Sequence, residues 1–207
     1  MARAAKTKQD LRSEATRQRL VTAARTMFAE RGYTGVGTEQ IVQEAGVTRG
    51  ALYHQFRDKA DLFAAVVETA QADVAHRITS GAESDGPVDA MTALHAGVRR
   101  FLEACADPAV ERILLLDGPA VLGWQAWRDL ADRYGLGLLR HGLQAAMDAG
   151  AITPQPIEPL AHVLIGALDE SALYIARAAD TAAARQQCIA ILQQLLGGLT
   201  PHAGQQS

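Results

Sequence analysis

The segment at residues 38–59, TEQIVQEAGVTRGALYHQFRDK, constrains the fold of this chain more than any other. Ile41 and Ala45 are four residues apart, which is the spacing of one helix face, and Leu52 and Phe56 repeat that spacing. Only the tripeptide Gly-Val-Thr lies between the two predicted helices. The pattern therefore predicts two short helices joined by a tight turn.

The turn and the second helix carry further signals. Gly46 can adopt the left-handed backbone that often ends a helix, and the Thr48 hydroxyl can cap the amides of the next helix. The second helix also offers polar and small residues on and around its exposed face: Arg49, Gly50, Ala51, Tyr53, His54 and Gln55. A helix that enters the major groove of DNA needs such a face, so we predict a helix-turn-helix. An ordinary helical hairpin inside an all-helical protein is the alternative.

The preceding residues complete a three-helix unit. A helix is predicted over residues 13–31, because Leu20, Ala24, Met27 and Phe28 form one apolar stripe. That stripe is expected to pack on the apolar residues of the helix-turn-helix. Three helices around a small core are the usual minimal DNA-reading unit.

The stretch from Gly32-Tyr33, through IVQEAGVTRGALYHQF, to Lys59-Ala60-Asp61-Leu62-Phe63 resembles the DNA-binding domain of the TetR family of bacterial regulators. The resemblance is close over residues 13–63. The chain departs from the family pattern at Gly37, where many members have a hydroxyl-bearing cap, and at Gln55, where His or Tyr is common. The implied DNA-binding residues are Thr38, Thr48, Arg49, Gly50, Ala51, Tyr53, His54 and Lys59.

Charge is distributed unevenly along the chain. Residues 1–60 hold eleven Lys and Arg against six Asp and Glu, a net charge of +5, whereas the remainder holds nine against seventeen, a net charge of −8. A basic N-terminal part is what neutralisation of DNA phosphates requires. Residues 1–12 are predicted to be a disordered basic arm, which either touches DNA or serves only as a solubilising tail.

Several function classes are disfavoured by the sequence. The chain has no apolar run long enough to cross a membrane and no apolar stretch behind its basic start, so a cytoplasmic protein is expected. No His-His pair has helical metal-ligand spacing, and no Ser stands on a strand-to-helix turn. We therefore expect no metal, no cofactor and no enzymatic activity. The two cysteines, Cys105 and Cys188, are interpreted as reduced core thiols.

Only helices are predicted for the rest of the chain. A lever-like helix is predicted over residues 58–79, and residues 80–87 form a loop by composition. Further helical patterns cover residues 91–105, 110–116, 124–149, 157–179 and 181–199. Glycines inside the 124–149 segment indicate close packing or a bend.

Two functional regions are expected in this second part. Family resemblance implies a small-molecule pocket, and we place it among Phe101, Cys105, Trp124, Trp127 and His162, although aromatic residues at helical spacing often form core instead. Asp169 or Glu170 could meet a cation if either points inward. The resemblance also implies dimerisation through the last two long helices, at Val163, Leu164, Ala167, Ile191, Leu192 and Leu195.

The predicted organisation is all-α with about nine helices. An arm (1–12) precedes the helix-turn-helix domain (13–57), a larger ligand-binding and dimerisation domain (58–200) and a tail (201–207). The predicted function is a homodimeric repressor that binds a palindromic operator in double-stranded DNA and is released by a small, partly hydrophobic ligand. An activator or ligand-independent regulator of this fold, or a helical enzyme or carrier, are the alternatives.

Overall fold

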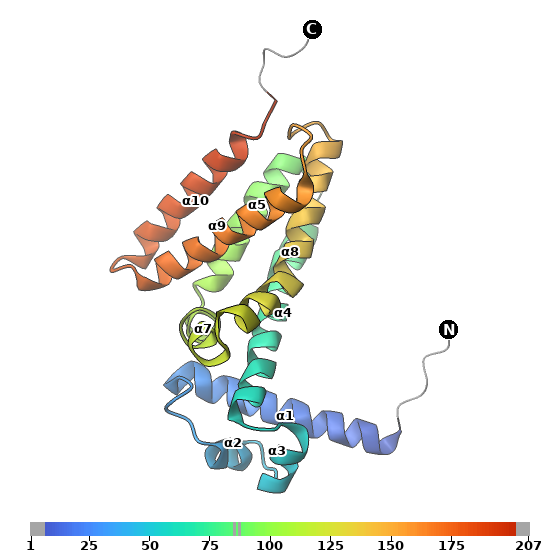
Figure 1. Cartoon of the computed structure of the whole chain (residues 1–207), viewed down its shortest axis with the longest axis vertical. Helices are drawn as coiled ribbons and strands as arrows, with labels where there is room; N and C mark the ends of the chain where they lie inside the picture. The colour runs from blue at the N-terminus through green and yellow to red at the C-terminus, as the bar shows by residue number, and fades with distance from the viewer. Residues whose placement is uncertain (1–6, 85, 87, 202–207) are drawn as a thin grey trace.

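The computed structural model of the chain describes residues 7–84, 86 and 88–201. Across these residues the chain forms nine α-helices of five residues or more, one three-residue helix and one π-helix, without any strand. The all-α prediction is confirmed. A small lower unit and a larger upper unit are joined by one long helix, as Figure 1 shows.

The lower unit contains α1 (Lys8–Arg31), α2 (Thr38–Glu44) and α3 (Arg49–Gln55). Helix α1 begins at Lys8 and not at residue 13, because a capping box forms in which Thr7 and Asp10 satisfy each other's backbone amides. Residues 8–12 of the predicted arm are therefore helical. Residues 1–6 lie outside the described part of the chain.

The long helix is α4 (Lys59–Ser84), and its N-terminus is capped by Asp58, whose Oδ1 accepts the Asp61 amide at 2.8 Å. It continues five residues beyond residue 79, where the sequence predicted a loop, and in this extension the Ser80 and Ser84 hydroxyls donate to helix carbonyls four residues back. Of the predicted loop, positions 85 and 87 lie outside the described residues.

The upper unit is built from the remaining helices. They are α5 (Ala90–Cys105), α6 (Pro108–Val110), the π-helix η1 (Glu111–Asp117), α7 (Gly118–Leu122), α8 (Trp124–Asp148), α9 (Ile157–Arg177) and α10 (Thr181–Gly197). Close approach within this unit depends on small residues. A side chain at Gly142 of α8 would lie 2.9 Å from Leu94 of α5, and one at Gly135 would lie 3.2 Å from Ile165 of α9. These two glycines therefore serve close packing, which is one of the two alternatives that the sequence left open.

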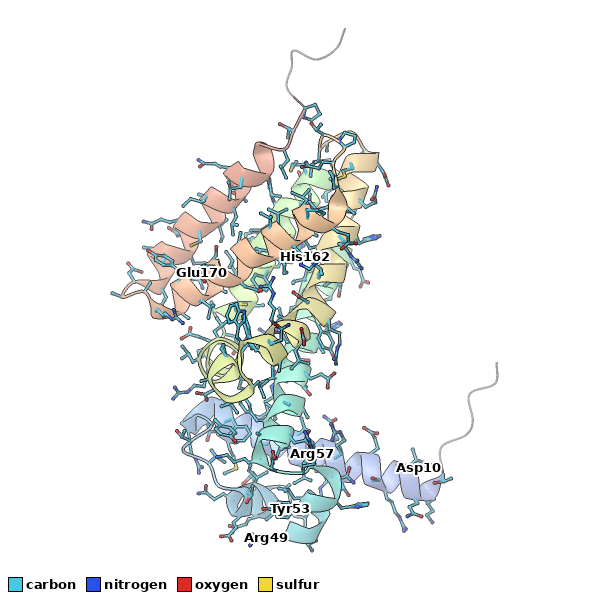
Figure 2. The ribbon with its side chains drawn as sticks, in the orientation of Figure 1. Asp10, Arg49, Tyr53, Arg57, His162 and Glu170 are labelled. Atoms are coloured by element: carbon cyan, nitrogen blue, oxygen red, sulfur yellow. The ribbon has the colours of Figure 1, made fainter. Side chains whose placement is uncertain are left out.

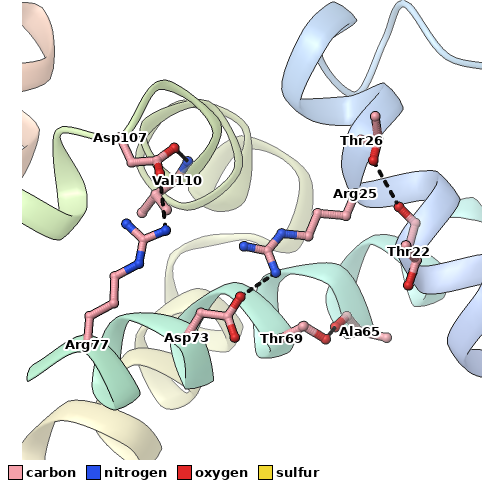
Figure 3. A network of polar contacts seen from close by, with 9 residues as sticks. All are labelled: Thr22, Arg25, Thr26, Ala65, Thr69, Asp73, Arg77, Asp107 and Val110. Atoms are coloured by element: carbon pink, nitrogen blue, oxygen red, sulfur yellow. Dashed lines mark hydrogen bonds and ion pairs between the residues drawn. The ribbon is translucent and has the colours of Figure 1, made fainter. Parts of the chain in front are cut away.

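Helix α4 belongs to both units. Near its start, Leu62 and Phe63 are fully buried, and the Phe63 ring packs edge-on against Phe28 of α1 at 5.3 Å, so the lower core extends beyond residue 57. Further along α4, Asp73 pairs with Arg25 of α1. Arg77 of α4 lies 3.1 Å from Asp107, beside α6, and Figure 3 shows both ion pairs on the same helix. No described helix is long and apolar enough to cross a membrane.

Candidate nucleic-acid interface and ligand site

The turn between α2 and α3 has the geometry expected of a helix-turn-helix. Gly46 adopts a positive φ of 60°, and the Thr48 hydroxyl accepts the Ala51 amide at 3.2 Å. Arg19 of α1 donates to the Gly46 carbonyl at 2.7 Å, which ties the turn to the first helix. The predicted roles of Gly46 and Thr48 as helix end and helix cap are confirmed by these contacts.

Helix α3 presents a polar, exposed face at one end of the molecule. Arg49, Tyr53 and His54 are all exposed, and Figure 2 shows Arg49 and Tyr53 at the end remote from α9. The Arg49 guanidinium lies 5.6 Å from the Tyr53 ring centroid and 3.6 Å from a Glu39 carboxylate oxygen. Both partners in that ion pair are largely exposed, so the pair is weak and leaves the guanidinium available.

Smaller residues surround this face. Gly50 and Thr48 are exposed, and Ala51 is half-buried, so the backbone at the start of α3 can approach a flat surface. Thr38, also half-buried, is the first residue of α2. Gly37 has no side chain with which to cap α2, but its own amide donates to the Gln40 side chain at 3.0 Å.

The start of α1 extends the same surface, and Arg12 there belongs to the arm for which DNA contact was one prediction, whereas Ser13 and Thr16 were not identified. Arg12, Ser13 and Thr16 line a groove of about 390 Å³ against His54 of α3. The Gln55 amide donates to the Ser13 hydroxyl at 2.7 Å, which fixes α1 beside α3. Arg12 and Thr16 are four residues apart, which is the spacing of one helix face. Because the helix was predicted to begin at residue 13, this spacing did not indicate a shared surface.

Lys59 is half-buried and is bound by backbone groups of the protein itself. Its ammonium donates to the carbonyls of Tyr33 and Val36, each at 2.8 Å, and lies 4.0 Å from the Tyr33 ring centroid. Burial lowers the pKa of Lys59. Lys59, which the resemblance implied as a DNA-binding residue, also holds the connection between α1 and α2.

The two tryptophans predicted to line a ligand site have different surroundings. Trp127 is buried, and its indole N–H donates to the Leu114 carbonyl of η1 at 2.7 Å. Trp124 is 57% exposed, although the two ring centroids are only 5.0 Å apart. Trp127 is thus part of the interior, and Trp124 lies at its margin.

The other predicted ligand residues are also divided. Cys105 is buried, and burial raises the pKa of its thiol to about 12. Phe101 is half-buried and packs against the core, whereas His162 lies on the exposed side of α9 (Figure 2). The structure therefore does not gather all five predicted residues around one point.

A buried ionic group lies in the same domain. Asp169 points inward and is only 7% exposed, while Glu170 is exposed. Arg128 bridges two carboxylates, with 2.8 Å to Asp169 and 3.1 Å to Asp132, although the Asp132 oxygen forms no directed hydrogen bond. Burial raises the pKa of Asp169 to about 6, against the opposing effect of Arg128. Two acids therefore share one guanidinium.

The predicted dimerisation residues occupy two sides of α9 and α10. Leu164 and Leu192 are buried in the protomer's own core, and Ala167 is half-buried. The outward side carries large exposed apolar residues: Val163 at 68%, Tyr174 at 57%, Ile191 at 55% and Leu195 at 53%. Tyr174 was not predicted, and it extends this outer apolar face toward the turn between the two helices.

Comparison with known proteins agrees with these features. Residues 20–66 match the family model described as bacterial regulatory proteins, tetR family, and residues 91–199 match the tetracyclin repressor-like C-terminal domain. The chain is 26% identical over 204 residues to the HTH-type transcriptional regulator AcrR of Shigella flexneri, covering 93% of both chains. It is 29% identical over 167 residues to the HTH-type transcriptional repressor AcnR of Corynebacterium glutamicum, covering 80% of this chain and 85% of AcnR.

Solved structures show the same fold. A TetR-family transcriptional regulator from Pectobacterium atrosepticum superposes with a TM-score of 0.83 and 34% identity, over 95% of this chain and 99% of that one. RolR, in complex with resorcinol, shares the fold at a TM-score of 0.68 and 22% identity, over 93% and 98% of the two chains. With the C-terminal family model matching more than half of its length, the chain belongs to the TetR family of DNA-binding transcriptional regulators.

Proposed function

We propose that this protein is a homodimeric repressor that binds a palindromic DNA operator in the cytoplasm and is released by a small, partly hydrophobic ligand. The observation that carries the proposal is the exposed face of α3 on a three-helix unit, which α4 joins to the upper unit. The DNA-reading end and the proposed ligand-binding end are therefore parts of one continuous packed structure.

On DNA, the residues of the lower unit have distinct proposed roles. Arg49 at the start of α3 can present a guanidinium to the O6 and N7 atoms of guanine. Tyr53, His54 and Thr38 contact phosphates, while Gly50 and Ala51, with the capping residue Thr48, allow the backbone to come close. Lys59 contributes by holding the connection between α1 and α2 through its two carbonyl contacts.

The dimer is proposed to form through the outer apolar face of α9 and α10. Four large apolar residues exposed together on a monomer would promote aggregation, whereas a two-fold interface between the two helix pairs would cover them. A dimer can then place two recognition helices about 34 Å apart, in successive major grooves. Family membership and the exposure of these residues support this arrangement.

The ligand is proposed to bind between α5, α8 and α9, beside Trp127, Cys105 and Phe101. Trp124 and His162 would lie at the margin of the site, and Asp169, paired with Arg128, would supply a polar anchor beside the apolar residues. The fold neighbour RolR holds resorcinol, a molecule of this general character. A ligand that releases DNA a hundredfold must prefer the released state by about 2.7 kcal/mol.

Selection of duplexes from a random-sequence library by the purified protein tests the DNA-binding part. Enrichment of a palindrome is expected, and Arg49→Ala should weaken binding to it. Arg99→Ala is the matched control, since Arg99 is an exposed arginine of α5 that is paired with Glu103 and remote from α3. Failure to enrich any duplex would refute the proposal.

A reporter gene placed behind the selected palindrome tests the direction of control. Repression that small aromatic compounds relieve would support the proposal. Increased expression would identify an activator, and repression that no compound in a broad panel relieves would identify a ligand-independent regulator.

A further inference from the structure

The connection between α1 and α2 is held from two sides by residues outside α1–α3. The Asp117 carboxylate, at the end of η1, accepts the Tyr33 amide at 2.8 Å. Lys59 donates to the carbonyl of the same residue, also at 2.8 Å. Tyr33 thus has its backbone amide bound by the upper unit and its backbone carbonyl bound by α4. The position of α2, which follows five residues later, depends on both contacts.

The approach of η1 to this connection is close. Gly32 ends α1 with a positive φ of 71° and is buried. A β-carbon at this position would lie 3.4 Å from both the Arg112 guanidinium and the Asp117 carboxylate. The upper unit therefore contacts the end of α1 directly, at a place separate from the α4 lever.

The other side of η1 is fixed by Trp127. Its indole N–H donates to the Leu114 carbonyl at 2.7 Å, in the middle of η1. A β-carbon at Gly118, the residue after η1, would lie 2.8 Å from the Trp127 ring. The indole therefore contacts Leu114, three residues before Asp117, and Gly118, one residue after it.

The π-helical form of η1 makes it sensitive to such contacts. π-Helices are rare, are usually short insertions in α-helical structure, and occur frequently at functional sites. Conversion of a π turn to an α turn changes the register by one residue, which rotates the following side chains by about 100°. Asp117 is the last residue of η1, so a change of register would move its carboxylate away from the Tyr33 amide.

We propose that Asp117 is a positioning residue for DNA recognition, and that η1 transmits the state of Trp127 to the connection between α1 and α2. This route acts in parallel with α4. The proposal depends on the proposed function only where affinity for DNA is measured, because the contacts themselves can be followed in the free protein.

Amide hydrogen exchange at Tyr33, measured by NMR on the full chain, tests the proposal directly. Asp117→Ala should accelerate exchange of this amide about tenfold, because a hydrogen bond to a charged acceptor is lost. Asp117→Asn keeps an acceptor oxygen and should retain most of the protection. Asp73→Ala is the matched control, since it removes a different ion pair to α1 and should leave the Tyr33 amide unchanged.

Trp127→Phe tests transmission, because it removes the indole N–H and keeps an aromatic ring. It should accelerate Tyr33 exchange severalfold, and the double variant with Asp117→Ala should exchange no faster than Asp117→Ala alone. Asp117→Ala and Trp127→Phe should each lower the affinity for the selected duplex, and the double variant should bind no more weakly than Asp117→Ala alone. Asp117→Asn should retain most of the affinity.

Each measurement has an outcome that overturns part of the proposal. Unchanged Tyr33 exchange in Asp117→Ala would show that Asp117 does not position the connection. Normal exchange in Trp127→Phe, or additive effects in the double variant, would show that η1 does not transmit. If no duplex is ever selected, the proposed function fails while the exchange measurements still decide this inference.

Discussion

The buried carboxylate of Asp169 should make folding stability depend on pH in a defined direction. Burial raises its pKa from 3.8 to about 6, so the folded state holds the proton more tightly than the unfolded state. The stabilisation from this proton is complete below about pH 4 and is lost as pH rises through about 6. A difference of about 2 pKa units corresponds to roughly 3 kcal/mol.

Urea unfolding of the wild-type protein and of Asp169→Asn, at one fixed protein concentration, measures this effect. The free energy of unfolding of the wild type, minus that of the variant, should fall by roughly 3 kcal/mol between about pH 4 and pH 6 and then stay constant. Asp129→Asn, at an exposed residue of α8 next to Arg128, is the control and should follow the wild type. A flat or rising difference would mean that the attraction of Arg128 outweighs burial, and the reasoning would be refuted.

Three further predictions concern DNA binding and assembly. Arg49→Ala should relax base preference at one position per half-site at a cost of about 1 to 3 kcal/mol, and equal losses across a panel of operator variants would contradict this role. Lys59→Met should weaken binding to all duplexes alike without changing its salt dependence, because the Lys59 ammonium is bound to two carbonyls. If the slope of log affinity against log salt concentration became smaller by about one, Lys59 would instead contact a phosphate. Leu195→Glu should give monomers or insoluble protein in sedimentation, whereas Val88→Glu, also at an exposed apolar residue, should sediment like the wild type.

The helix-turn-helix could be predicted in detail because its determinants are local. Gly46 and Thr48 act on residues within a few positions of themselves, and the four-residue spacing of Leu52 and Phe56 defines the buried side of α3. The start of α1 was missed although its signal is equally local. Thr7 and Asp10 have the spacing of a capping box, but the basic composition around them suggested an arm.

The second part of the chain could be predicted only as helices. Sequence periodicity could not separate the two sides of an apolar stripe, so Leu192, which faces the protomer core, was grouped with the exposed Leu195. It also could not decide between Asp169 and Glu170, since their directions depend on how α9 packs. The contact between Asp117 and Tyr33 joins residues 84 positions apart, and no pattern within either segment indicates it.

The unequal surroundings of the two tryptophans have an optical consequence. The chain has only these two indoles, and the exposed Trp124 should emit at longer wavelength and be accessible to iodide, whereas the buried Trp127 should emit at shorter wavelength. Their ring centroids are 5.0 Å apart, so excitation will pass readily from one to the other. Quenching one ring will therefore also dim its neighbour. Only a chain with Trp124→Phe would report the interior beside η1 as an isolated chromophore.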